Sequence, residues 1–498
     1  MAITAGGSLN SVPAPRQQTL DSNYLDFTAT ATAGWAQQFL PDLMEKEAEV
    51  FGPRTISGFL SQVGAEEAMA SDQVIWSEQG RLHLSYTGAV TNGDAGTIAG
   101  GQITIGKDID GVAAGAAHGI RKNDMVIIAS SEGTVKALVT LVTAASAVIE
   151  VAPYGVVDLN DVFTDSQGAD SVTVLVYGSE YSKGDNYDGG STRGANEPKF
   201  KTFSNKPIIL KDYYEVSGSD TSRIGWVEVA AEEGASGFLW YLKAEADTRA
   251  RFNDYLEMSM LEGVKGGAAD GYTGGVADLT DAHLGTDGAV TGTQGLFNAI
   301  EERGNITTGV TGVNAATDLA EFDAILAEFD KQGAIEENMM FVNRATSLAM
   351  DDMLASMNSY GAGGTSYGVF DNNEDMALNL GFSGFRRGSY DFYKSDFRYL
   401  NDKATRGSIN SAYAAGAIRG LIVPAGTSTV YDQQLGKNLK RPFLHVRYRA
   451  SQTDNRKMKS WVTGSVGAAT SALDAMQIHM LSERCLVTQG ANNFMLMK

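Results

Sequence analysis

The sequence predicts an α+β protein, because segments with strand periodicity and segments with helix periodicity occupy different parts of the chain. Short β-type runs gather between residues 88 and 178, a long helical stripe covers residues 237–262, and strand patterns return after residue 440. The chain has 498 residues, enough for roughly two to four domains. Its 57 Gly against 9 Pro favour many turns and loops over a helical bundle.

The block at 88–178 is dense in Gly, Ala, Val and Thr, and turn signals such as Ser131-Glu132-Gly133 divide it. Its strand-forming runs lie at 125–128, 138–142, 147–151 and 172–176. Short strands at this spacing predict a small β-barrel or sandwich of about 90 residues. The flanking segments differ in character, so we interpret the block as an insertion.

The longest helical signal covers residues 237–262, which would span about 37 Å at 1.5 Å per residue. The apolar face is predicted to contain Phe238, Tyr241, Leu242, Phe252, Tyr255, Leu256 and Met260. Opposite charges four residues apart are expected at Lys243–Asp247, Glu245–Arg249 and Asp247–Arg251. Such a helix would be the spine of a domain.

Further elements follow from the same patterns. Asp318 is predicted to cap a helix that stops at Gly333, with Glu321 completing the capping box. Other helices are expected at 35–50, 296–303 and 347–357, and strands at 339–342, 443–448, 460–462 and 476–481. The last ten residues are apolar enough to be packed.

The composition excludes several classes of protein. The formal charge of −21, from 60 acidic and 39 basic residues, argues against an enzyme that grips nucleic acid. The single cysteine, Cys485, excludes an intrachain disulfide and a four-cysteine zinc site. No run reaches the ~20 apolar residues that span a membrane, and no signal peptide is predicted at the start. We expect a protein that is made and stays soluble inside a cell.

One short pattern in the sequence matches a catalytic motif, the nucleophile elbow of serine hydrolases. Ser366 lies in a G-x-S-x-G pattern at 364–368, which works only on a strand-to-helix turn. A loop precedes it here, so a chance match is the favoured interpretation. A calcium-type start at 371–375 fails because Met376 and Phe382 replace the required Gly and Glu. The five histidines are scattered, and Cys485 is predicted to be a buried, inert thiol. No catalytic residue, cofactor site or metal site is predicted.

Two stretches carry a resemblance to a known family. The first is GSEYSKG at 178–184 followed by KFKTFSNKPIILKD at 199–212, and the second is RCLVTQGANNF at 484–494. With the order of arm, long excursion, spine helix, α/β region and returning strands, the chain resembles the major capsid proteins of tailed bacteriophages with the Hong Kong 97-type fold. The likeness covers most of the chain.

The resemblance implies a division into parts. Residues 1–55 would be an N-terminal arm, and 56–225 an extended loop that contains the inserted β domain at about 88–178. Residues 226–265 and 440–498 would form the peripheral domain, and 266–439 the axial domain.

The resemblance also implies partners. Subunits would assemble as homo-pentamers and homo-hexamers into an icosahedral head that encloses double-stranded DNA, in the virion, after synthesis in the bacterial cytoplasm. A separate scaffolding protein, a portal and decoration proteins would assist. One family member cross-links Lys to Asn, and Lys183 and Lys199 lie in the corresponding loop, although nothing marks either as reactive. The basic clusters at 437–441 and 447–449 are interpreted mainly as partners for acidic residues of neighbouring subunits.

Two alternatives stay open at this point. A cellular encapsulin-like nanocompartment shell has the same type of fold, although the length and the inserted domain favour the phage interpretation. A serine hydrolase that uses Ser366 is the second alternative.

Overall fold

The fold is described from a computed structural model. It describes residues 58–60, 65–78, 83–93, 100–142, 147–164, 168, 170–184, 201–219, 228–230, 236–266, 292–333, 335–358, 384–425, 427–432, 437–465 and 469–498. The chain divides into two compact units, one formed by Ser77–Thr202 and the other by the segments up to Trp76 and from Phe203 onward. The expected helix at 35–50 and the segment around Ser366 lie outside the described residues.

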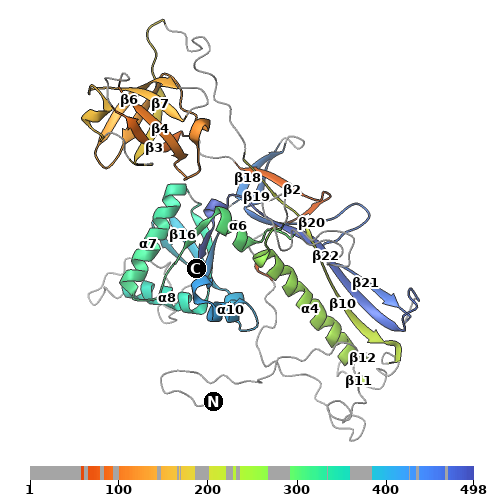
Figure 1. Ribbon diagram of the computed structural model, residues 1–498. Helices are drawn as coiled ribbons and strands as arrows, with labels where there is room; N and C mark the ends of the chain where they lie inside the picture. The colour runs from red at the N-terminus through yellow and green to blue at the C-terminus, as the bar shows by residue number, and fades with distance from the viewer. Residues whose placement is uncertain are drawn as a thin grey trace. The chain divides into compact units, whose positions relative to one another are not determined.

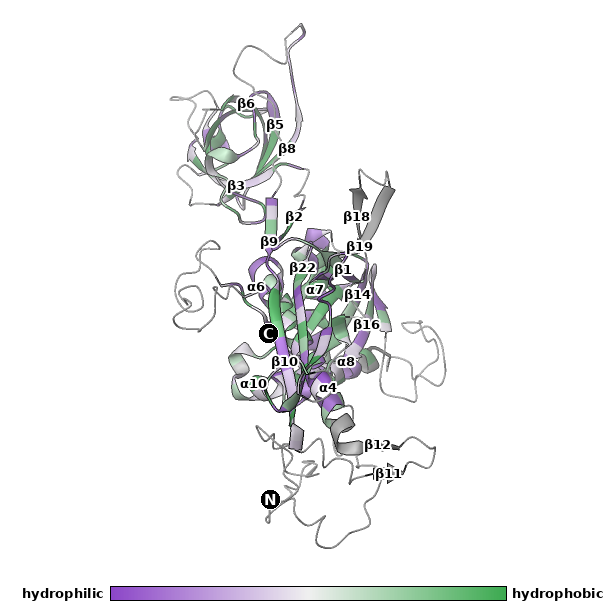
Figure 2. Ribbon diagram, turned by 90° about the vertical axis from the view of Figure 1, so that its right-hand side faces the viewer, coloured by the Kyte–Doolittle hydropathy of each residue, from purple (hydrophilic) through white to green (hydrophobic). Residues whose placement is uncertain are grey.

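The Ser77–Thr202 unit contains a closed six-stranded barrel (Figure 2). Its strands, in the order in which they pair, are β3 (Ser85–Asn92), β4 (Gln102–Asp108), β7 (Val148–Pro153), β6 (Thr134–Val142), β5 (Asp124–Ala129) and β8 (Val172–Ser179). Each of the four strand-forming runs of the sequence lies in one of these strands or overlaps it. Closure removes the unpaired edges that an open sheet of this size would expose.

The barrel interior is apolar because alternate side chains of each strand point inward. Val90, Ile103, Ile128 and Val174 are all fully buried there. A short 3-10 turn, η2 (Leu159–Asp161), adds Leu159 to the same core, together with Phe163 after it. The barrel therefore has a hydrophobic core of its own.

The other unit is built on two sheets. The first has five strands, and its central strand is β22 (Ala475–Thr488). The first part of β22 lies antiparallel between β10 (Ile208–Ser217) and β21 (Lys459–Gly464). Its last part pairs with β20 (Leu444–Arg449), and β20 pairs in parallel with β1 (Ala65–Met69).

The helix α4 (Leu239–Glu262) lies along this first sheet, as Figure 1 shows. It matches the predicted helix at 237–262 except that residues 236–238 form the short strand β12 (Ser236–Phe238). Phe252 and Leu256 pack against Ile478 and Met480 of β22. The sequence predicts Tyr255 on this apolar face, but the side chain is exposed. On a helix with 3.6 residues per turn, Tyr255 lies to one side of Phe252 and Leu256, at the edge of the apolar stripe.

The charge pairs on α4 differ in part from expectation. Glu245 and Arg249 form the predicted pair, with 3.3 Å between Oε1 and Nη2. Arg251 instead reaches Asp212 of β10, 3.3 Å between Nη2 and Oδ2. This contact joins the helix to the sheet, whereas the sequence predicts a pair with Asp247 in the preceding turn of the helix.

The second sheet has six strands. In pairing order they are β13 (Asn305–Thr307), β23 (Met495–Met497), β17 (Gly420–Pro424), β14 (Glu337–Val342), β16 (Tyr390–Asp396) and β15 (Gly384–Arg387). Its central strands are buried on both faces. Ile422 and its neighbours on one face pack under α7 (Ala315–Gln332) and α8 (Arg344–Asn358). Leu421 and Leu496 on the other face join a core shared with Leu444 and Leu486 of the first sheet.

One sequence expectation needs correction here. The helix predicted from Asp318 begins earlier, because the Asn314 side chain accepts a hydrogen bond from the Thr317 N–H at 2.9 Å and caps it. Asp318 is buried in the first turn, where it accepts from the Gly312 N–H at 2.8 Å. Gly333 ends the helix with a left-handed φ of 64°, as predicted. The C-terminal residues assigned to the peripheral domain end in β23, which belongs to the second sheet.

Smaller elements complete the described chain. The helix α6 (Leu296–Arg303) has the predicted bounds. The two-stranded pairs are β2 (Val74–Glu78) with β9 (Lys201–Asn205), β11 (Glu228–Ala230) with β12, and β18 (Thr427–Asp432) with β19 (Lys437–Pro442). Two short helices are α9 (Arg398–Asn401) and α10 (Arg406–Ala412). Residues 58–60 enter the shared core, where the Phe59 ring meets Phe341 and Phe397.

Replacement of Phe392 by Ala tests the packing of the second sheet. Phe392 is buried between the rings of Phe322 and Phe385, so its loss leaves a cavity and should lower the free energy of unfolding by about 3–5 kcal/mol. The next residue, Tyr393, is exposed, and Tyr393→Ala is the matched control. Chemical unfolding followed by fluorescence would measure both. Equal effects of the two substitutions would contradict the packing described.

Candidate interaction surface

The first sheet has one covered face and one open face. On the covered face, Met476, Ile478 and Met480 of β22 pack against α4. Successive side chains of a strand point to opposite faces, so Gln477, His479 and Leu481 lie on the open face. The candidate surface is built on these three positions and on their partners across β10 and β21.

Three rings form a row across the open face, which we call the aromatic row: Tyr213, His479 and Trp461. The strand register places them directly opposite one another, Tyr213 with His479 and His479 with Trp461. The Tyr213 and His479 rings are stacked with centroids 6.1 Å apart, and the Trp461 and His479 rings with centroids 5.2 Å apart. Tyr213 is 57% exposed and Trp461 38% exposed.

A chain of hydrogen bonds fixes one side of the row. The Thr463 Oγ1 lies 2.7 Å from Nε2 of His479. The Thr463 hydroxyl is also 3.3 Å from Oε1 of Gln477, whose amide donates to Glu215 at 2.6 Å. These partners come from all three strands. They hold the imidazole ring in place although it is partly exposed.

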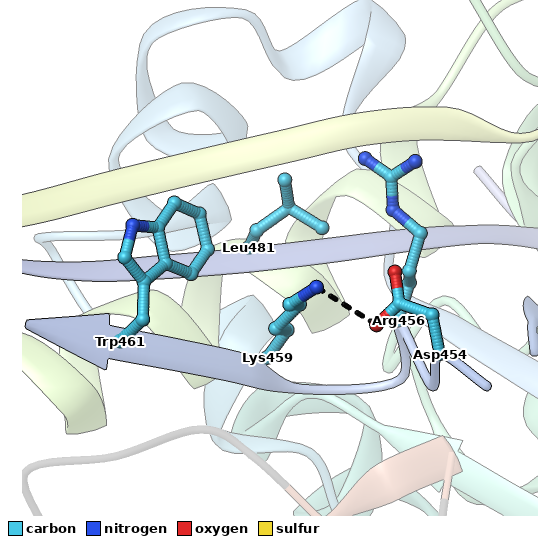
Figure 3. Close-up of a pocket in the computed structure, with 5 residues that line it drawn as sticks. All are labelled: Asp454, Arg456, Lys459, Trp461 and Leu481. Atoms are coloured by element: carbon cyan, nitrogen blue, oxygen red, sulfur yellow. Dashed lines mark hydrogen bonds and ion pairs between the residues drawn. The ribbon is translucent and has the colours of Figure 1, made fainter.

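A shallow pocket of about 440 Å³ lies on the other side of the row. Asp454, Arg456, Lys459, Trp461 and Leu481 line it, and Figure 3 shows how Trp461 and Leu481 flank the lysine. Lys459 Nζ lies 2.8 Å from Oδ1 of Asp454. The hydrogen bond from Lys459 holds the pKa of the Asp454 carboxyl below its usual value. The pocket thus presents an ion pair beside an indole ring.

A denser charge cluster lies next to the pocket. Glu483 is buried, and its carboxylate is 2.7 Å from Nε of Arg449 and 3.1 Å from Nη1 of Arg456. Arg449 also contacts Asp72. Two residues before Arg449 on β20, Arg447 lies 2.7 Å from Glu67 of β1. The arginines at 447 and 449 therefore bind carboxylates of their own chain, which corrects the expectation that they serve mainly neighbouring subunits. The side chains at 437–441 lie outside the described residues.

The only cysteine of the chain is not exposed on the open face. Cys485 is fully buried in β22, and burial raises the pKa of its thiol to about 12. Among the described residues, no three His, Cys, Asp or Glu side chains come together as metal ligands. Ser366 and His283 lie outside the described residues, as does Lys199, whereas Lys183 is exposed after β8. No described helix is long and apolar enough to cross a membrane.

Sequence reasoning did not find the aromatic row. His479 is one of five histidines scattered along the sequence, and the other two rings of the row lie 266 and 18 residues away from it. The sequence does show that Tyr213 and Trp461 each lie in a run with the alternating pattern of a β-strand. That alternation gives the face of a residue within its own strand but not the register between strands.

Comparisons with known proteins give distant structural similarity. A chain from Microbacterium phage Oxtober96 is 9% identical, with 94% of this chain and 99% of that chain covered and a TM-score of 0.37. The capsid structure of the cyanophage P-SCSP1u (10% identity, 64% and 80% coverage, TM-score 0.33) and the mature capsid of bacteriophage PhiM1 (9% identity, 64% and 78% coverage, TM-score 0.31) are also similar. No protein-family model and no curated protein matches the sequence.

The burial of Cys485 can be tested by thiol labelling at pH 8. Because the thiolate is the reactive form and burial both raises the pKa and blocks access, the native protein should react with Ellman's reagent only as fast as it unfolds. Addition of denaturant should release one thiol per chain. A Tyr413→Cys variant supplies an exposed thiol as the fast-reacting control. Rapid labelling of the unmodified native protein would contradict the buried site.

Proposed function

We propose that the chain is the major capsid protein of a tailed bacteriophage. Its copies would assemble as pentamers and hexamers into an icosahedral head that encloses double-stranded DNA. The observation that carries this proposal is the aromatic row, an exposed set of rings on a rigid sheet. Exposed aromatic clusters of this kind mark protein–protein contact surfaces.

The proposal assigns roles to the parts of the chain. Residues 226–265 and 440–498 would form the peripheral domain, with α4 and most strands of the first sheet, to which β1 and β10 add their strands. Residues 266–439 would form the axial domain, with α7, α8 and most strands of the second sheet, which β23 completes. Residues 1–55 would be an arm and 56–225 an extended loop that carries the barrel. A subunit of this design offers several separate surfaces, which a closed shell with many neighbours requires.

The negative charge is compatible with a container. Enclosing a genome needs no affinity for it, and a charge of −21 disfavours adhesion of the shell to its contents. A separate scaffolding protein would guide assembly, and a portal and decoration proteins would complete the particle. The protein would then be part of the virion, after synthesis in the host cytoplasm.

Electron microscopy of the protein, expressed alone and together with a scaffolding protein, tests the proposal directly. Closed shells with five- and six-fold capsomers are the expected result. A monodisperse monomer under every condition would overturn the proposal. Shells that package a protein cargo in place of DNA would indicate an encapsulin-like compartment. Turnover of a model ester that is lost in Ser366→Ala would indicate the hydrolase alternative.

The role of the aromatic row can be tested by replacing Trp461 and Tyr213 together with Ala. The two side chains are partly exposed but stack on His479, so the free energy of unfolding of the subunit should fall by about 1–3 kcal/mol while the subunit stays folded. Loss of an aromatic contact at an interface typically costs about 2 kcal/mol or more, and the cost recurs at every copy. The yield of shells should therefore fall at least tenfold.

Tyr413→Ala is the matched control, because Tyr413 is an equally exposed aromatic residue that follows α10. Sedimentation would quantify shells, and circular dichroism would check the fold of each variant. Equal shell yields for the double variant and the control would remove the aromatic row from the interface.

A further inference from the structure

The ribbon formed by β2 and β9 connects the two compact units. The chain leaves the larger unit after Trp76 and returns to it at Phe203, and the division between the units falls directly next to these two residues. Their rings lie on paired strands, with centroids 6.2 Å apart. Trp76 and Phe203 thus mark the base of the ribbon.

A single cation lies over both rings. Cζ of Arg303 is 4.3 Å from the centroid of Phe203 and 5.6 Å from the centroid of Trp76. A guanidinium over an aromatic face is attracted by the ring quadrupole, and its planar shape also stacks on the ring. Arg303 therefore contacts both strands of the ribbon at the same level.

Arg303 is itself held by the larger unit. It is the last residue of α6, where the helix dipole favours a positive charge. Its Nη2 donates to the Thr488 carbonyl at the end of β22 and to Oε1 of Gln294, at 3.4 Å in each case. The guanidinium consequently bridges a fixed part of the fold and the base of the ribbon.

Asn205 anchors the same end of β9. It is 1% exposed, and its amide donates to the carbonyls of Leu486 at 2.6 Å and Gln294 at 3.0 Å. Its Oδ1 accepts from the Gln294 N–H at 2.9 Å and from the Thr293 hydroxyl at 3.1 Å. The backbone of β9 is thus fixed two residues after Phe203.

We propose that Arg303 is the positioning residue that clamps the base of the β2–β9 ribbon and so restrains the segment that leads to the barrel. The clamp is a property of the single subunit. It goes beyond the proposed capsid function and does not depend on it, because the ribbon and Arg303 are present before any assembly.

Hydrogen exchange followed by mass spectrometry on the purified full-length subunit tests the clamp. In Arg303→Ala, amides of β2 and of the first residues of β9 should exchange about tenfold faster, because the local opening no longer breaks a cation–π contact. In Arg303→Lys, which keeps the charge but loses the planar group, the increase should be intermediate. Exchange in the barrel core and in β22 should stay unchanged.

Arg249→Ala is the matched control, since it removes an arginine that pairs with Glu245 on the exposed side of α4. Unchanged exchange of β2 and β9 in folded Arg303→Ala would overturn the proposal, as would an equal increase in the control. Faster exchange throughout the subunit would also overturn it, because it would indicate a general structural role. If the subunit never forms shells but the ribbon still loosens in Arg303→Ala, the proposed function fails and the clamp stands.

Discussion

β22 is the strand on which the larger unit depends. Its 14 residues pair with β10 and β21 along the first part and with β20 along the last part. The chain then continues into β23 of the second sheet. One continuous segment of about two dozen residues therefore belongs to both sheets, and Leu486 and Leu496 from it contribute to the shared core. A displacement of this segment would disturb both sheets at once.

Buried charges fix the register of that strand. Glu483 is neutralised by two arginines, and Arg484 donates to the Ser482 hydroxyl and to the Lys457 carbonyl, both at 2.9 Å. Burial lowers the pKa of Arg484, so the ion is held at a cost that these bonds offset. A shift of β22 by one residue would separate Glu483 from its two arginines and Arg484 from the Lys457 carbonyl, which is far more costly than a shift between apolar residues.

A second buried carboxylate, that of Glu257, fixes the backbone of residues 58–60. Glu257 of α4 accepts a hydrogen bond from the Gly58 N–H at 2.8 Å, next to the rings that surround Phe59. Burial raises the pKa of Glu257, and the backbone N–H groups of residues 58–60 oppose that change. The helix therefore binds residues 58–60 through both a polar contact and the insertion of an aromatic ring into the core.

Periodicity along the chain predicted most local structure and little of the surface. The helix at 296–303, most of α4 and the four barrel runs follow from spacing alone, because burial of one face imposes that spacing. The sequence does not distinguish the true helix cap, Asn314, from Asp318, because Asn and Asp are equally good capping residues. The partners of Arg447 and Arg449 and the aromatic row could not be predicted, because each joins strands whose register is set by tertiary packing. The same holds for Arg303, whose two ring partners lie 227 and 100 residues away.

The aromatic row combines exposure with rigidity, and this combination has an energetic consequence. α4 supports the sheet from behind, and a hydrogen bond between Thr463 and His479 fixes the central ring. Rings that are already fixed lose little conformational entropy when a partner covers them, so more of the contact energy is retained as binding energy. The charges around the pocket are largely satisfied within the chain, so they contribute selectivity more than strength. In the proposed shell, such a surface would give contacts of defined geometry, and the curvature of a shell made of many identical copies can close only if that geometry is the same at every copy.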